Sequence, residues 1–76
     1  MPHVVAKLVA GRSEAQKQRI DDAVTQAVAQ TPDRGAAAVS VAIEDVAEAD
    51  WDAKVFVPDI AGEAATLYKK PGYRAV

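Results

Sequence analysis

The 76-residue sequence contains no cysteine and only one histidine, so neither disulfides nor a closed structural zinc site can stabilise its fold. Large apolar side chains are also scarce, because 17 of the 38 apolar residues are alanine and 11 are valine. Ordering a chain costs about 1.5 kcal/mol per residue, whereas burying an alanine methyl returns only about 0.8 kcal/mol. Self-association is the remaining way to stabilise so small a domain, and we therefore expect a homo-oligomer.

Two further absences exclude whole classes of function. The chain has no excess of basic residues, because its net charge is −2 and its pI is near 5.2, whereas nucleic-acid binders carry a dense positive surface. No apolar run approaches the roughly 20 residues of a membrane span, and no segment resembles a signal peptide. We expect one cytoplasmic domain, residues 1–76, that binds neither nucleic acid nor membranes.

The spacing of the apolar residues predicts a strand, a helix and a second strand. Residues 2–9 and 38–43 alternate as strands, and the first is apolar on both faces. Between them, Ser13 and Gln16 form a capping box at the start of a helix over residues 14–30. A helix of this length between two strands forms a right-handed βαβ crossover, so the strands are expected to be parallel.

The rest of the chain is expected to add one more helix. Residues 44–52 are an acidic stretch around Trp51, and Pro58 is expected to open the second helix. The first helix should end at Pro32 and bury one stripe, while its polar residues stay exposed. The expected stripe is Ile20, Ala23, Val24, Ala27 and Val28; the exposed residues are Lys17, Gln18, Arg19, Asp21 and Asp22; Lys69 and Lys70 end the second helix. The fold class is therefore α/β (α+β), a small βαβ unit with parallel strands plus a C-terminal helix.

The usual catalytic side chains are almost absent. One histidine and no cysteine exclude a Cys-His pair and leave no cluster of metal ligands, and there is no glycine-rich phosphate loop. The carboxylates of residues 44–52 are expected to form a solvated loop, since no cationic neighbour is evident in the sequence. We expect neither a cofactor nor a metal.

The amino terminus offers the remaining candidate. Met1 precedes a small residue, so it is a usual substrate for removal, which leaves Pro2 with a free secondary amine. An α-amino group titrates near ~8, and burial or a nearby cation lowers its pKa towards neutrality, where a general base works best. The alternative is that Pro2 only begins a strand, where proline is well tolerated.

The combination of these features resembles the 4-oxalocrotonate tautomerase family of the tautomerase superfamily. The resemblance rests on Pro2 opening a short strand, residues 11–13 followed by residues 16–17, the βαβ unit, and Trp51. It covers nearly the whole chain. The ending Lys-Lys-Pro-Gly-Tyr at residues 69–73 is similar to that of a bacterial branch called PptA-like. Members of that branch form dimers, whereas shorter members form hexamers, so the resemblance favours a homodimer and leaves a hexamer possible.

The resemblance also implies roles for individual residues. Pro2 matches the family's general base, Arg12 an arginine that binds a substrate carboxylate, and Trp51 an aromatic wall of the pocket. Trp51 is equally an aromatic core anchor, and the two roles are compatible. Ser40 stands where the shorter members carry a second arginine, and a serine can donate one hydrogen bond but supplies no positive charge. The implied substrate is a small 2-oxo acid or its enol with one carboxylate.

Several alternatives stay open at this point. Lys7, Arg34 or Lys54 could replace the second arginine, although each is expected to be solvated surface, and His3 is expected to be structural. The competing functions are a non-catalytic oligomeric module of the same fold, or hydration, dehalogenation or decarboxylation of small acids.

Overall fold

A computed structural model describes residues 1–30 and 35–76. The predicted helix stop at Pro32 and the candidate cation Arg34 therefore lie outside the described residues. The chain divides into two compact units, residues 1–45 and 46–76, and each is described by itself. The elements are β1 (His3–Val9), α1 (Glu14–Ala29), the short 3-10 helix η1 (Ala36–Ala38), β2 (Ser40–Val46), the 3-10 helix η2 (Glu48–Asp50), the π-helix η3 (Asp52–Ala61) and the 3-10 helix η4 (Ala64–Thr66).

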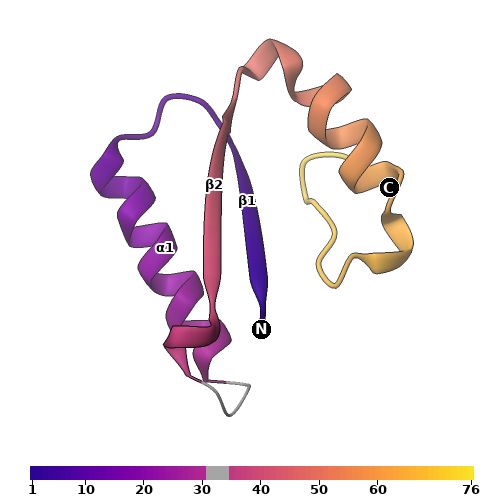
Figure 1. Ribbon diagram of the computed structural model, residues 1–76. Coiled ribbons are helices and arrows are strands. Elements are labelled where there is room, and N and C mark those ends of the chain that lie inside the picture. Colours follow the sequence, from indigo (N-terminus) through magenta and orange to yellow (C-terminus); the bar gives the residue numbers. More distant parts are fainter. Residues whose placement is uncertain (31–34) are drawn as a thin grey trace. The chain divides into compact units, whose positions relative to one another are not determined.

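The first unit contains the predicted βαβ arrangement. Strands β1 and β2 pair side by side and run in the same direction, and α1 connects them across one face (Figure 1). The alternation predicted for β1 is present in its first four residues, where Val4 and Ala6 are half-buried and His3 and Val5 are exposed. The rest of the strand, residues 7–9, is half-buried on both faces. The α+β fold class is thereby confirmed. Strand β2, however, begins at Ser40 rather than at residue 38, since three successive alanines form η1 instead, and it continues to Val46.

Helix α1 begins as predicted, and the predicted stripe is half-buried in part. The Ser13 hydroxyl accepts a hydrogen bond from the Gln16 amide at 3.1 Å, and the Ser13 amide donates to the Gln16 side chain at 2.9 Å. The helix ends one residue earlier than expected, at Ala29. Of the predicted stripe, Ile20, Val24 and Val28 are half-buried but Ala23 and Ala27 are exposed, while Lys17 and Asp21, predicted to be exposed, are half-buried.

The second helix differs most from the sequence prediction. Pro58 lies inside η3 and does not open it, and Lys69 and Lys70 lie beyond the helical residues of this unit. In an α-helix a proline ring clashes with the carbonyl four residues earlier. In a π-helix the amides bond to carbonyls five residues earlier, so the backbone around Pro58 follows a different path. The turn closes where the Gly62 amide donates to the Val57 carbonyl at 2.8 Å. A Cβ on Gly62 would lie 2.7 Å from the Pro58 carbonyl oxygen, so a side chain does not fit there.

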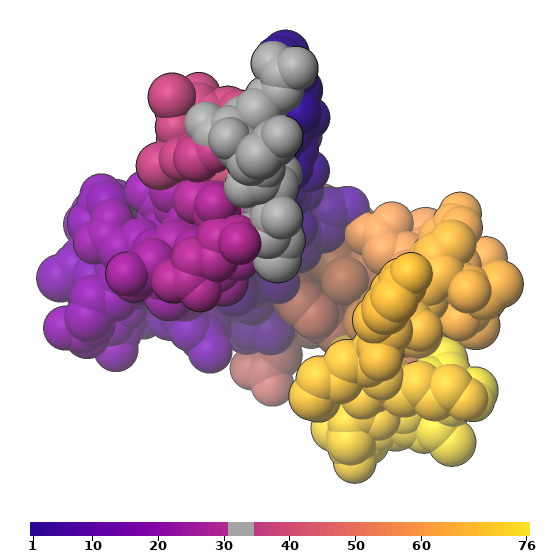
Figure 2. All heavy atoms as spheres, turned by 90° about the horizontal axis from the view of Figure 1, so that it is seen from below, coloured from indigo at the N-terminus to yellow at the C-terminus, as the bar shows by residue number. Residues whose placement is uncertain are grey.

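The core of the described chain is small, as the composition indicates. Among residues 1–30 and 35–76, only Val55 and Phe56 are buried, each with 4% of its surface exposed, and both belong to η3. The atoms of the C-terminal residues, orange to yellow, gather in one cluster (Figure 2). Within the described part of the chain, no helix is long and apolar enough to cross a membrane.

Candidate functional site

Two of the predicted site residues, Pro2 and Ser40, lie together at the start of the sheet. The Ser40 amide donates to the Pro2 carbonyl at 3.1 Å, which holds the first residues of the two strands side by side. The Ser40 hydroxyl also lies 2.7 Å from Nδ1 of His3. Because the strand pairing uses only the Pro2 carbonyl, it makes no demand on the Pro2 nitrogen. Both His3 and Ser40 are exposed, so this polar pair is accessible beside Pro2.

Met1 can be removed with little effect on the fold. Its side chain is 97% exposed, whereas Pro2 is half-buried. Loss of Met1 therefore removes little buried surface and leaves the Ser40 bond to Pro2 in place. While Met1 is attached, the Pro2 nitrogen is an amide and has no basicity. The chemistry expected of Pro2 thus depends on this one processing step.

Arg12 lies at the opposite end of β1 from Pro2. Its Nη1 donates to the Val9 carbonyl at 3.2 Å, and Gly11 makes the turn after the strand with φ of 126°. The seven-residue strand, at a rise of about 3.3 Å per residue, separates its two ends by roughly 20 Å. Within one chain, the structure therefore does not bring Arg12 together with Pro2, although the resemblance assigns both to one substrate.

Trp51 belongs to the second unit, where it joins η2 to η3. Its side chain is half-buried, and its indole N–H donates to the Tyr73 hydroxyl at 3.1 Å. Asp52, the next residue, accepts a hydrogen bond from Arg74 at 2.8 Å. Trp51 is therefore tied by its polar edge to the C-terminal segment of its own unit. Tyr73 closes the Lys-Lys-Pro-Gly-Tyr ending noted in the sequence, but sequence reasoning assigned no role to Tyr73 or to Arg74.

The acidic stretch has cationic partners that the sequence did not reveal. Lys17 pairs with Asp45 at 2.5 Å, Lys54 with Asp50 at 3.3 Å, and Arg74 with Asp52 at 2.8 Å. Asp45 and Asp52 are exposed, as expected of a solvated stretch, but all three carboxylates also have cationic partners. Lys17 of α1 and Arg74 of the C-terminal segment reach them from distant parts of the chain, whereas Lys54 lies four residues beyond Asp50. Paired and exposed carboxylates of this kind are poor candidates for general acid-base chemistry.

One lysine is electrostatically perturbed. The hydrogen bond from Lys17 to Asp45, aided by the negative charges of Asp45 and Glu14, raises the pKa of Lys17 above its ordinary value of 10.5. Lys17 is a residue of α1 whose side chain reaches Asp45 of β2, and that side chain is 19% exposed. It therefore links the first turn of α1 to the end of β2.

We expect Lys17→Met to lower the free energy of unfolding at neutral pH and to have little effect in strongly alkaline solution. Since the folded-state pKa is raised, the stabilisation is complete below 10.5 and is lost as the pH rises through the folded-state value. Urea unfolding of both proteins across this range measures the difference. Lys54→Met is the matched control, because its ion pair with Asp50 is more exposed and should contribute less. An equal loss in both variants at neutral pH would contradict this account.

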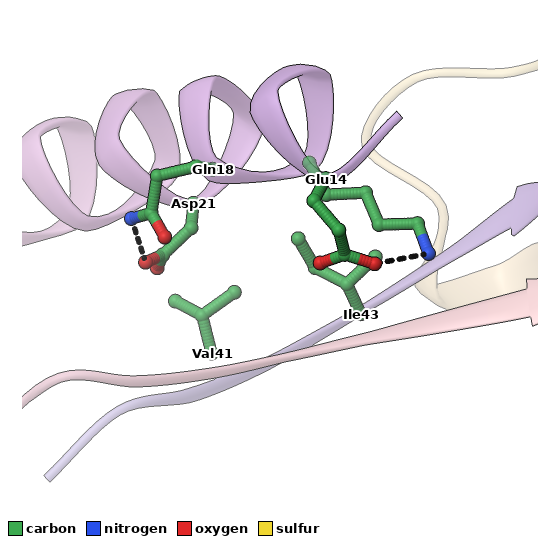
Figure 3. Close-up of a pocket in the computed structure, with 6 residues that line it drawn as sticks. Glu14, Gln18, Asp21, Val41 and Ile43 are labelled. Atoms are coloured by element: carbon green, nitrogen blue, oxygen red, sulfur yellow. Dashed lines mark hydrogen bonds and ion pairs between the residues drawn. The ribbon is translucent and has the colours of Figure 1, made fainter. Parts of the chain in front are cut away.

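An open hollow of about 340 Å³ lies between α1 and β2. Val41 and Ile43 form its floor, and polar side chains of α1 cover it, joined by hydrogen bonds and an ion pair among themselves (Figure 3). None of the four predicted site residues lines it. Across the described residues, no three side chains of His, Cys, Asp or Glu are grouped so that they could hold a metal ion.

The candidate replacements for the second arginine can now be placed. Lys7 is half-buried in β1 and already has an interaction partner, and Lys54 is engaged with Asp50. His3, expected to be a partly exposed structural histidine, is exposed and contacts the hydroxyl of Ser40. Ser40, which stands where the shorter family members carry the second arginine, therefore has its hydroxyl already hydrogen-bonded to the His3 imidazole.

Comparison with known proteins adds independent information about this chain. The sequence profile of a family described as "Tautomerase enzyme" matches residues 2–57. A protein of Xylella fastidiosa (strain 9a5c) named "Probable tautomerase" is 40% identical over 73 residues, which cover 96% of this chain and 89% of that protein. "Tautomerase PptA" of Cronobacter sakazakii (strain ATCC BAA-894) is 35% identical over 74 residues, covering 96% and 97%.

Proposed function

Because the chain belongs to the tautomerase family, we propose that it is an isomerase that interconverts the enol and keto forms of a small 2-oxo acid, without a cofactor. The resemblance noted in the sequence is confirmed at the level of the family, and the matched region begins at Pro2 itself. Both named relatives are tautomerases by name and align over nearly the whole chain. The proposed reaction, like that of 4-oxalocrotonate tautomerases, moves one proton and changes no oxidation state.

Pro2 is proposed as the general base. After removal of Met1, its secondary amine accepts the proton of the enol hydroxyl and becomes an ammonium group. The electron pair of the O–H bond forms the carbonyl, the C=C electrons form a new C–H bond at the neighbouring carbon, and the ammonium group supplies that proton. The amine is thus regenerated. The observation that carries the proposal is the position of Pro2, whose carbonyl is fixed by Ser40 while its nitrogen takes no part in strand pairing.

Arg12 is proposed to bind the substrate carboxylate, and it must do so from a second copy of the chain. Roughly 20 Å of β1 separates it from Pro2 in its own chain, a span that a small 2-oxo acid cannot bridge. Two copies that meet across the exposed face of the sheet could bring the Arg12 of one near the Pro2 of the other. The small core leaves apolar surface for such an interface. We propose a homodimer, with a hexamer as the alternative assembly.

Ser40 and Trp51 are proposed to complete the substrate contacts. The Ser40 hydroxyl is oriented by His3 and can hydrogen-bond the enol or keto oxygen, but it cannot neutralise a second carboxylate. Trp51 is proposed to contact the apolar part of the substrate. This combination favours monocarboxylic substrates, such as an aryl or alkyl enolpyruvate, over dicarboxylates.

The direct test is the ketonisation of phenylenolpyruvate, followed by loss of its enol absorbance. The purified protein should accelerate the reaction well above the rate in buffer, and a dicarboxylic enol of similar size should react less efficiently. A rate equal to that of buffer would overturn the proposal.

A further inference from the structure

The indole of Trp51 is held by a residue outside the region that defines the family. The family match ends at residue 57, yet Trp51 donates its N–H to the hydroxyl of Tyr73, 22 residues further along the chain. An indole has a single donor, so this bond uses all of its hydrogen-bonding capacity. What Trp51 can offer to another molecule is therefore the apolar surface of its ring.

The segment that carries Tyr73 is fastened at several points. The Tyr73 ring packs against Phe56, with centroids 6.3 Å apart and planes inclined by 58°. Arg74 lies over the Phe56 ring, 3.9 Å from the ring centroid, and its Nη1 pairs with Asp52. Phe56 is one of the two buried side chains among the described residues. The Tyr73 hydroxyl is thus placed by the contact of its ring with a buried side chain of its own unit.

We propose that Tyr73 is a positioning residue that fixes the orientation of the Trp51 ring and so sets the affinity for the apolar group of the substrate. This inference rests on the proposed function, in which Trp51 contacts that group. A ring with its N–H bonded cannot turn about its side-chain torsions without breaking the bond, so its face is presented in one orientation. When the hydroxyl is removed, the indole N–H must turn towards water, and the apolar face is no longer held in place.

The decisive variant is Tyr73→Phe, which removes one hydroxyl and keeps the ring that packs on Phe56. Binding of phenylpyruvate is measured by equilibrium dialysis, which does not depend on turnover. We expect the variant to bind about 3- to 10-fold more weakly, as loss of one neutral hydrogen bond implies. Because Trp51 is the single tryptophan, the emission spectrum of the protein reports its surroundings, and it should shift in this variant.

A second variant separates positioning from a general loss of structure. Trp51→Phe should weaken binding by itself, and adding Tyr73→Phe to it should cause no further loss, because the hydroxyl then has no indole to hold. Tyr68→Phe is the matched control. Tyr68 is fully exposed, so loss of its hydroxyl should change neither phenylpyruvate binding nor tryptophan emission. Wild-type affinity in Tyr73→Phe, unchanged binding in Trp51→Phe, or multiplying losses in the double variant would each overturn the inference. Failure of the proposed function would show separately, as absence of ketonisation by the wild-type protein.

Discussion

Pro2→Ala is expected to lower kcat/KM for ketonisation of phenylenolpyruvate by about 10²-fold. Alanine at this position still permits removal of Met1, so the variant keeps an amino group but loses the ring that fixes the nitrogen. The resulting primary amine rotates freely and is misplaced relative to the enol proton. Rates measured from acid to alkaline pH should show a changed profile, because the titrating base differs.

The folded state offers a control for this variant. Alanine retains the carbonyl that accepts the Ser40 amide, so the pairing of β1 with β2 persists and thermal unfolding should move by only a few degrees. A fall in activity with an intact fold would then be caused by the change in the amine and not by loss of structure. Wild-type activity with an unchanged pH profile would show that Pro2 is not the base.

Arg12→Gln should raise KM and lower kcat/KM by about 10- to 100-fold. A charge-assisted hydrogen bond contributes about 1.5–3 kcal/mol, and glutamine cannot provide the paired donors that a guanidinium offers a carboxylate. Steady-state kinetics with phenylenolpyruvate measure both constants. Arg19→Gln, on the exposed face of α1, is the matched control and should leave them unchanged. Equal effects in the two variants would mean that overall charge, not a carboxylate site at Arg12, sets the kinetics.

Mixing the two impaired variants, Pro2→Ala and Arg12→Gln, tests whether a second copy completes the site. In a homodimer whose sites each combine Pro2 of one chain with Arg12 of the other, a Pro2→Ala chain paired with an Arg12→Gln chain has one fully native site. After unfolding and joint refolding at equal amounts, about a quarter of wild-type activity should return. No recovery above the separate variants would place both residues in the same chain's site and contradict the roughly 20 Å separation.

The parts of the fold that follow from local rules were predictable. The capping box at Ser13 and Gln16, the alternation in the first half of β1 and the parallel βαβ connection all depend on residues close together in sequence, and all are present. The second helix was predicted to start at Pro58 because proline favours the first helical turn. The structure instead begins this helix at Asp52 and absorbs the proline in π geometry, which no local preference indicates.

The residues of the candidate site could be identified from the sequence, but their contacts with one another could not. The family resemblance picked out Pro2, Arg12, Ser40 and Trp51, yet only Pro2 and Ser40 are joined by a hydrogen bond. The bonds from His3 to Ser40 and from Tyr73 to Trp51 span 37 and 22 residues, so no pattern of neighbouring residues signals them. Two of the three cationic partners of the acidic stretch were missed for the same reason, as Lys17 reaches Asp45 across 28 residues and Arg74 reaches Asp52 across 22.

The mature protein is proposed to act through the free amine of Pro2, and the intact mass of the active protein decides whether it does. The species that catalyses ketonisation is expected to be lighter than the encoded chain by one methionine residue. A fully active protein that retains Met1 would contradict it, because the Pro2 nitrogen would then be an amide without basicity.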